Sequence, residues 1–144
     1  MQIGYTAGTF DLLHVGHINI LKRARSLCDR LIVGVSTDRL VEDYKHKTPV
    51  YPFQDRCLLV ESVRYVDAVV PQVCLDKFEA WMRLHFNVLF VADDWYGNDS
   101  WKIYEESLSK VGVPVVYLPY TSGISSSIVR DTISKESKDV EQVS

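Results

Sequence analysis

The stretch Gly8-Thr9-Phe10-Asp11-Leu12-Leu13-His14-Val15-Gly16-His17 decides the fold of this chain, because it joins an apolar strand to an amphipathic helix. Before it, apolar residues alternate with smaller or more polar ones, as in a half-buried strand ending at Gly8. After it, apolar residues recur at the spacing of one buried helix face. His17 therefore falls at the start of a helix, where unpaired backbone N–H groups and the helix dipole favour an anion. The alternating strand residues are Ile3, Tyr5 and Ala7, and the helix face is Ile20, Leu21, Ala24, Leu27 and Cys28.

The composition is that of one globular domain. The chain has 144 residues, of which 47% are apolar and 24% are charged. No apolar run reaches the roughly 20 residues of a membrane helix, and no secretory signal precedes the first strand, so we expect a cytoplasmic protein without membrane contact. The net charge is −3 without a basic stripe, which favours small-molecule partners over nucleic acid. The three cysteines are odd in number, widely spaced and without a C-x-x-C pair, so they indicate neither a disulfide framework nor a zinc site.

Strand and helix patterns alternate along the chain, which predicts parallel strands joined by helical crossovers. We therefore expect an α/β fold, a Rossmann-like three-layer sandwich with a five-stranded, mostly parallel sheet, over residues 1–134, followed by a polar, frayed tail at 135–144. Later strands are expected over 30–36, 67–70 (closed by Pro71), 88–92 and 113–118. Later helices are expected from Thr37 or Asp38 to Tyr44, over 55–65 with Leu58, Leu59 and Val63 inward, over 77–85, over 100–110, and from Ser125.

Ligands of such sheets bind beyond the carboxyl ends of the strands, where the strand order reverses. His14 and His17 lie there, and a metal pair is one interpretation, but no third ligand with suitable spacing accompanies them, so no metal site is expected. Phosphate contact is the better interpretation. Gly16 leaves space beside the second histidine, and imidazole N–H donors suit the oxygens of a transferring phosphate.

Other polar segments follow later strands. Ser125, Ser126 and Ser127 come after Gly123 and would begin a second helix facing the same crevice, although a plain N-cap explains them too. Lys45 and Lys47 are either a solvated loop pair or a mobile phosphate clamp. Asp93 and Asp94 suit recognition of a base or ribose, or help with a metal, because a phosphate nucleophile is already ionised and needs no general base.

Together these segments resemble the cytidylyltransferase family, in particular its bacterial branch acting on glycerol 3-phosphate. The resemblance covers about residues 3–133 and rests on the Gly8–His17 stretch and four shorter ones. These are Ser36-Thr37-Asp38, Arg64-Tyr65-Val66-Asp67, Asp93-Asp94-Trp95 and Gly123-Ile124-Ser125-Ser126.

The resemblance implies transfer of CMP from CTP onto a phosphorylated small alcohol, with release of pyrophosphate and formation of a CDP-alcohol. It also implies Mg²⁺, bound mainly through the CTP phosphates, and a homodimer whose contact lies near Arg64–Asp67. It assigns catalysis to His14, His17, Lys47 and Arg56, and acceptor binding to Asp11, Lys45 and Lys77. It assigns nucleotide binding to Thr9, Phe10, Gly16, Asp94, Tyr120, Thr121, Gly123, Ile124, Ser125, Ser126 and Ser127.

Two departures from the family pattern concern the acceptor. Tyr120 stands where the family has an arginine, which removes a bidentate phosphate contact. The family's tryptophan before the acceptor lysine has no counterpart, since Cys74 and Leu75 stand there. Two alternatives therefore stay open: an adenylyltransferase of the same superfamily, and a CTP-binding protein with weak or lost catalysis.

Overall fold

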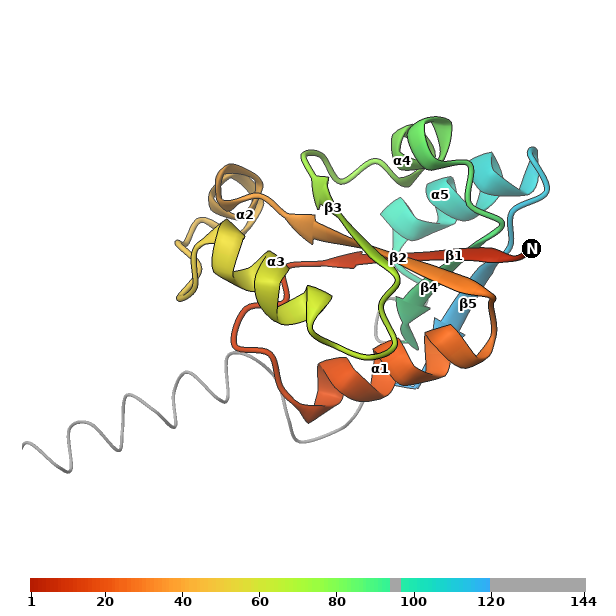
Figure 1. The fold of residues 1–144 in the computed structure, drawn as a ribbon. Coiled ribbons are helices and arrows are strands. Elements are labelled where there is room, and N and C mark those ends of the chain that lie inside the picture. Colours follow the sequence, from red (N-terminus) through yellow and green to blue (C-terminus); the bar gives the residue numbers. More distant parts are fainter. Residues whose placement is uncertain (94–96, 120–144) are drawn as a thin grey trace, which may run out of the picture.

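Five parallel strands form one sheet in the order β3-β2-β1-β4-β5, as the computed structural model shows (Figure 1). The structure describes residues 1–93 and 97–119. The strands are β1 (Ile3–Gly8), β2 (Arg30–Ser36), β3 (Ala68–Gln72), β4 (Val88–Ala92) and β5 (Val115–Leu118). The helices are α1 (Val15–Ser26), α2 (Asp38–Lys45), α3 (Phe53–Glu61), α4 (Lys77–Leu84) and α5 (Asp99–Ser109).

Helices cover both faces of this sheet, which confirms the three-layer sandwich. One hydrophobic core packs α1 and α3 against the sheet, with Leu21, Ala24 and Val60 fully buried. A second core packs α4 and α5 on the other face, with Ala80 and Leu108 buried there. In Figure 1, α1 and α3 lie below the sheet and α4 and α5 lie above it. Strand order reverses between β1 and β4, and the stretch after β1 begins at that point.

The expected end of the third strand at Pro71 is wrong. Pro71 lies inside β3 and pairs in register with Val35 of β2. Since β3 is at the edge of the sheet and pairs only with β2, a residue lacking an N–H is tolerated there. The strand continues to Gln72, whose side chain is buried at the carboxyl end of β3.

The expected inward face of α3 is also wrong. Leu58 and Leu59 are 62% and 38% exposed, whereas Arg56 and Val60, one turn apart, are fully buried. Arg56 points inward because its hydrogen-bond partners lie in the interior, and this sets which face of α3 is buried. The apolar pattern of the helix therefore predicts a different face from the one observed. Val63 does pack against the core as expected. The helix also spans Phe53–Glu61 rather than 55–65, and β5 begins at Val115 rather than at 113.

No helix in the described part of the chain is long and apolar enough to cross a membrane. The helix expected from Ser125 and the tail at 135–144 lie outside the described residues.

Gly34 of β2 lies very close to the Tyr5 side chain of β1. A Cβ at Gly34 would lie 2.2 Å from the Tyr5 hydroxyl oxygen and 2.9 Å from ring atom Cζ. Gly34→Ala should therefore cost about 1–3 kcal/mol, as overpacking does. The Tyr5 hydroxyl is buried without a hydrogen-bond partner among the described residues, and burial raises the pKa of Tyr5 to about 12.

Tyr5→Phe alone should leave stability unchanged or higher, because it removes an unsatisfied polar group. Tyr5→Phe combined with Gly34→Ala should recover part of the loss. Urea unfolding of the four proteins measures this coupling, and a Gly34→Ala protein as stable as the wild type would contradict the packing.

Candidate active site

A cavity of about 530 Å³ opens at the carboxyl ends of β1 and β4, where the strand order reverses. It gathers eight of the residues that sequence singles out, from the segment between β1 and α1, from α1, from the end of α2 and the loop after it, and from the start of α4. They are Thr9, Phe10, Asp11, His14, His17, Lys45, Lys47 and Lys77. Gly16 and Arg56 do not line it.

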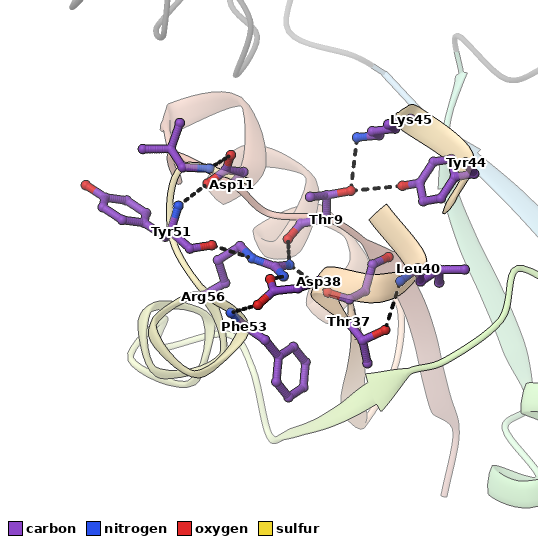
Figure 2. Close-up of polar contacts among 12 residues, drawn as sticks. Thr9, Asp11, Thr37, Asp38, Leu40, Tyr44, Lys45, Tyr51, Phe53 and Arg56 are labelled. Atoms are coloured by element: carbon purple, nitrogen blue, oxygen red, sulfur yellow. Dashed lines mark hydrogen bonds and ion pairs between the residues drawn. The ribbon is translucent and has the colours of Figure 1, made fainter. Parts of the chain in front are cut away.

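Between β1 and α1 the backbone is held in an unusual conformation. Phe10 and Leu12 have φ angles of 54° and 52°, in the left-handed region that bulky residues seldom adopt. Between them, the buried Asp11 accepts hydrogen bonds from the Val50 and Tyr51 backbone N–H groups at 2.7 and 3.0 Å (Figure 2). The carboxylate therefore anchors the segment that follows Lys45 and Lys47, and its expected contact with the acceptor stays a prediction.

Both histidines are fixed by backbone N–H groups at the start of α1. The His14 ring caps the helix, where its Nδ1 accepts from the Gly16 N–H at 3.0 Å. The His17 Nδ1 accepts from the His14 N–H at 3.1 Å, and the two rings stack with centroids 3.9 Å apart. Since both Nδ1 atoms accept, each neutral ring carries its proton on Nε2.

The surroundings keep these rings neutral. Burial, with the neighbouring His14 and Lys45, lowers the pKa of His17 to about 4. Burial also lowers the pKa of His14. Within the described part of the chain the His14 Nε2 atom is buried and has no hydrogen-bond partner. An unsatisfied N–H donor in a cavity at a helix N-terminus is suited to an anionic oxygen.

Arg56 does not line the cavity, and its guanidinium holds the surrounding segments together (Figure 2). Its Nη1 donates to the carbonyl oxygens of Thr9 at 2.8 Å and Ser36 at 2.7 Å, at the ends of β1 and β2. Its Nε donates to the Tyr51 carbonyl at 3.0 Å, and its Nη2 lies 2.6 Å from the Asp38 carboxylate. The residue is fully buried, so its guanidinium positions the segments around the cavity, and its expected catalytic role stays a prediction.

The segment from Lys45, at the end of α2, to Pro52, which we call the lysine loop, meets the residues after β1 through the Thr9 side chain. The Lys45 ammonium donates to the Thr9 hydroxyl oxygen at 3.0 Å, and the Tyr44 hydroxyl lies 2.9 Å from the same atom (Figure 2). Lys45 and Lys47 are exposed and both line the cavity. The loop therefore brings two positive charges to the cavity that holds the histidines.

Lys77 supplies a third cation, but from a buried position. It is the first residue of α4 and only 5% exposed, and its ammonium donates to the Gln72 side-chain oxygen at 2.7 Å and to the Leu75 carbonyl at 3.0 Å. It lies 5.5 Å from the centre of the Trp101 ring, a cation–π contact. Burial lowers the pKa of Lys77 to about 8, so the group is still mostly protonated at neutral pH.

Sequence reasoning predicted Lys77 but missed the other residues of a second wall of this cavity, which we call the acceptor wall. Gln72 lies two residues beyond the strand that the sequence predicts over 67–70, so its position at a strand end was not expected. The contribution of α5 carried no sequence signal, because its residues read as ordinary helix residues. The acceptor wall comprises Gln72, Leu75, Lys77, Asn98, Ser100, Trp101 and Tyr104.

The remaining nucleotide contacts expected from sequence, Asp94 and Tyr120, Thr121 and Gly123 to Ser127, lie outside the described residues. Among the described ones, no three His, Cys, Asp or Glu side chains gather where they could hold a metal ion.

Comparison with known proteins shows the family to which this chain belongs. The family model described as cytidylyltransferase-like matches residues 5–132, so the chain belongs to the cytidylyltransferase-like family and is a nucleotidyltransferase. It is 37% identical over 129 residues to a glycerol-3-phosphate cytidylyltransferase of Staphylococcus aureus, covering 89% of this chain and 92% of that protein.

Two further proteins are more distant in coverage or in sequence. An ethanolamine-phosphate cytidylyltransferase of Dictyostelium discoideum is 45% identical over 98 residues, covering 65% of this chain and 26% of that protein. The crystal structure of a lipopolysaccharide core biosynthesis protein from Thermoplasma volcanium superposes with a TM-score of 0.70 at 24% identity, covering 84% of this chain and 97% of that chain. This last likeness shows the shared fold.

The depressed pKa of His17 predicts how stability depends on pH. As pH falls, the unfolded chain protonates this residue near its ordinary pKa of 6.5, while the folded chain does so only near 4. Stability is therefore complete above about pH 6.5 and is lost as pH falls towards 4, by about 3 kcal/mol. In His17→Asn, whose amide oxygen can replace Nδ1, this part of the loss should vanish.

Chemical unfolding across pH 4–7 measures the difference. His85→Asn is the matched control, because His85 is an exposed C-cap with a left-handed backbone that asparagine tolerates. An equal pH slope in His17→Asn and the wild type would contradict a buried neutral His17.

Replacement of the buried guanidinium should destabilise the whole site. A single lysine ammonium cannot donate to all the oxygens that the Arg56 guanidinium binds. Arg56→Lys should therefore lower the free energy of unfolding by about 2–4 kcal/mol, because buried acceptors are left unpaired. Arg23→Lys, at an exposed position on α1, should change stability by less than about 0.5 kcal/mol. Urea unfolding compares the two, and equal stabilities would show that the contacts of Arg56 are dispensable.

Proposed function

We propose that this enzyme transfers CMP from CTP onto a phosphorylated small alcohol, glycerol 3-phosphate or a close analogue, giving a CDP-alcohol and pyrophosphate. The observation that carries the proposal is the stacked pair of neutral histidines at the start of α1, with their Nε2–H groups available to phosphate oxygens. The similarity to a glycerol-3-phosphate cytidylyltransferase over 89% of the chain supports the choice of substrates.

The reaction is an in-line displacement at phosphorus. An oxygen of the acceptor phosphate attacks the α-phosphorus of CTP, and a new P–O bond forms between them. The bond from the α-phosphorus to the oxygen bridging the β-phosphorus breaks, and pyrophosphate leaves with that electron pair. Because the attacking phosphate is already ionised at neutral pH, no side chain has to remove a proton. The work of the protein is to position the two anions and to stabilise developing charge.

The described residues divide this work. His14 and His17 donate Nε2–H bonds to the oxygens of the α-phosphorus and the leaving pyrophosphate, at the positive end of the α1 dipole. Lys47 offsets the charge of the triphosphate from the loop, and Lys45 and Lys77 meet the acceptor. Like charges on CTP and the acceptor repel, so bringing them together needs several fixed cations.

Mg²⁺ belongs to this proposal as a partner of the triphosphate. Asp11 is the one carboxylate among the described lining residues, and its two oxygens accept backbone N–H groups. This donor set fits a Mg²⁺ ion held by phosphate oxygens and water rather than by a protein cage. When bound, the ion would neutralise charge on the leaving pyrophosphate. A homodimer with its contact near Arg64–Asp67 is also part of the proposal.

The decisive test is a matched pair of histidine variants. His17→Asn keeps an acceptor for the His14 N–H but loses the Nε2–H donor, so kcat for pyrophosphate release from CTP and glycerol 3-phosphate should fall about 10²–10³-fold. The His85→Asn control should keep wild-type kcat. Near-normal turnover by His17→Asn would overturn the assignment of this residue.

Calorimetric titration with CTP and ATP separates the remaining alternatives. We expect tighter binding of CTP. A clear preference for ATP would favour an adenylyltransferase, and CTP binding without turnover of any acceptor would favour a nucleotide-binding protein that has lost catalysis.

A further inference from the structure

A tyrosine lines the cavity from the last turn of α2, next to Lys45. The hydroxyl oxygen of Tyr44 lies 2.9 Å from the Thr9 hydroxyl oxygen, which also accepts from the Lys45 ammonium at 3.0 Å (Figure 2). The same ammonium lies 5.5 Å from the centre of the Tyr44 ring, a cation–π contact. Thr9, Tyr44 and Lys45 thus form one unit just after β1, which we call the Thr9 cluster.

The backbone is fixed on both sides of the Thr9 cluster. The Thr9 carbonyl oxygen accepts from the buried Arg56 guanidinium at 2.8 Å, and the next residue, Phe10, is buried with a φ angle of 54°. On the other side α2 ends directly after Lys45, because His46 has a left-handed backbone (φ 56°) that stops the helix. What remains to be ordered is therefore the long side chain of Lys45.

Lys45 is exposed, and among the described residues no carboxylate forms a salt bridge with it. An exposed lysine samples many rotamers, so fixing it when a ligand binds costs conformational entropy. The bond to Thr9 and the contact with the Tyr44 ring restrict the ammonium before a ligand arrives. Its charge then faces the cavity, where it contributes to the lowered pKa of His17.

The hydroxyl protons decide what Tyr44 adds. An ammonium can only donate, so Lys45 occupies one of the two lone pairs on the Thr9 hydroxyl oxygen. If Tyr44 donates to the second lone pair, the Thr9 proton is left to point into the cavity. If Tyr44 instead accepts that proton, Thr9 has none to offer a ligand. An anionic oxygen in the cavity selects the first arrangement, because it binds the Thr9 proton more strongly than a phenol oxygen does.

We propose that Tyr44 is a positioning residue of the active site, whose hydroxyl donates to Thr9 and so keeps the Lys45 ammonium and the Thr9 proton directed at the substrate phosphates. This inference rests on the proposed function, because it concerns the two phosphates of that reaction. Lys45 meets the acceptor and Thr9 meets the nucleotide, so one phenol aligns groups that bind both substrates. Phenylalanine in its place would keep the ring but would release the Thr9 hydroxyl and, with it, the lysine.

The first experiment removes only the phenol oxygen. Tyr44→Phe should raise KM for glycerol 3-phosphate about three- to tenfold at saturating CTP, as the loss of one hydrogen bond does, and should change kcat by less than about twofold. Tyr51→Phe is the matched control and should keep both values, because the Tyr51 side chain is exposed and does not line the cavity. An unchanged KM in Tyr44→Phe would overturn the inference and leave the proposed transfer standing.

The second experiment asks whether Tyr44 acts through Lys45. Lys45→Met removes the ammonium and should raise KM for glycerol 3-phosphate by a larger factor than Tyr44→Phe does. Adding Tyr44→Phe to Lys45→Met should raise KM by less than about twofold more, because no ammonium is left to position. If the two factors multiply instead, Tyr44 acts independently of Lys45, and the inference is wrong. Thermal unfolding completes the comparison, since a merely structural role would lower the Tm and kcat of Tyr44→Phe while KM stays unchanged.

Calorimetric titration with CTP alone separates this inference from the proposed function. Tyr44→Phe should bind CTP about threefold or more weakly than the wild type, because the Thr9 proton is no longer directed at the nucleotide, whereas Tyr51→Phe should bind it equally well. Weaker binding by Tyr44→Phe in a protein that turns over no acceptor would count against the proposed function alone. Equal binding of CTP by Tyr44→Phe and the wild type would overturn the inference.

Discussion

The site depends on one buried guanidinium. Arg56 donates to the carbonyl ends of β1 and β2, to the loop after α2 and to the carboxylate that begins α2. Strand ends and loops have backbone oxygens without ladder partners, and a buried carbonyl left unpaired is costly. The planar fork of arginine satisfies several such oxygens from one point. The lysine loop therefore stays beside the stretch after β1 because the same side chain holds both.

This arrangement explains why α3 shows its apolar residues to solvent. Because a helix normally buries its apolar stripe, the sequence predicts that Leu58 and Leu59 face the core, whereas both are exposed. The hydrogen bonds of Arg56 are available only if that side chain points inward, and Val60 follows it one turn later. The hydrogen bonds of Arg56 outweigh the burial of two leucines. Such hydrogen bonds produce no periodic pattern in the sequence, so the buried face could not be predicted from it.

Much of the architecture was nevertheless predictable. Alternating strands and helices predict the parallel sheet, and the position of His14 and His17 between β1 and α1 predicts an anion site at a helix N-terminus. The tautomers of the two rings were not predictable, because they follow from three-dimensional contacts with backbone N–H groups. The left-handed backbone at Phe10 and Leu12 was hidden as well, since bulky residues give no warning of it.

In the proposed reaction the cavity meets phosphate oxygens in two ways, and each suits its position. Neutral imidazoles fixed by the backbone would supply directed donors to the reacting phosphate, without the cost of burying a second and third charge. Full charges come from Lys45 and Lys47 at the exposed loop, and from Lys77 where an indole and an amide make burial tolerable. The family's tryptophan is missing just before Lys77, yet Trp101 brings an indole to that lysine from α5. Trp101 thus provides, from another element of the fold, the indole that the sequence lacks just before Lys77. A change of acceptor preference should therefore be sought by varying α5 rather than the segment before α4.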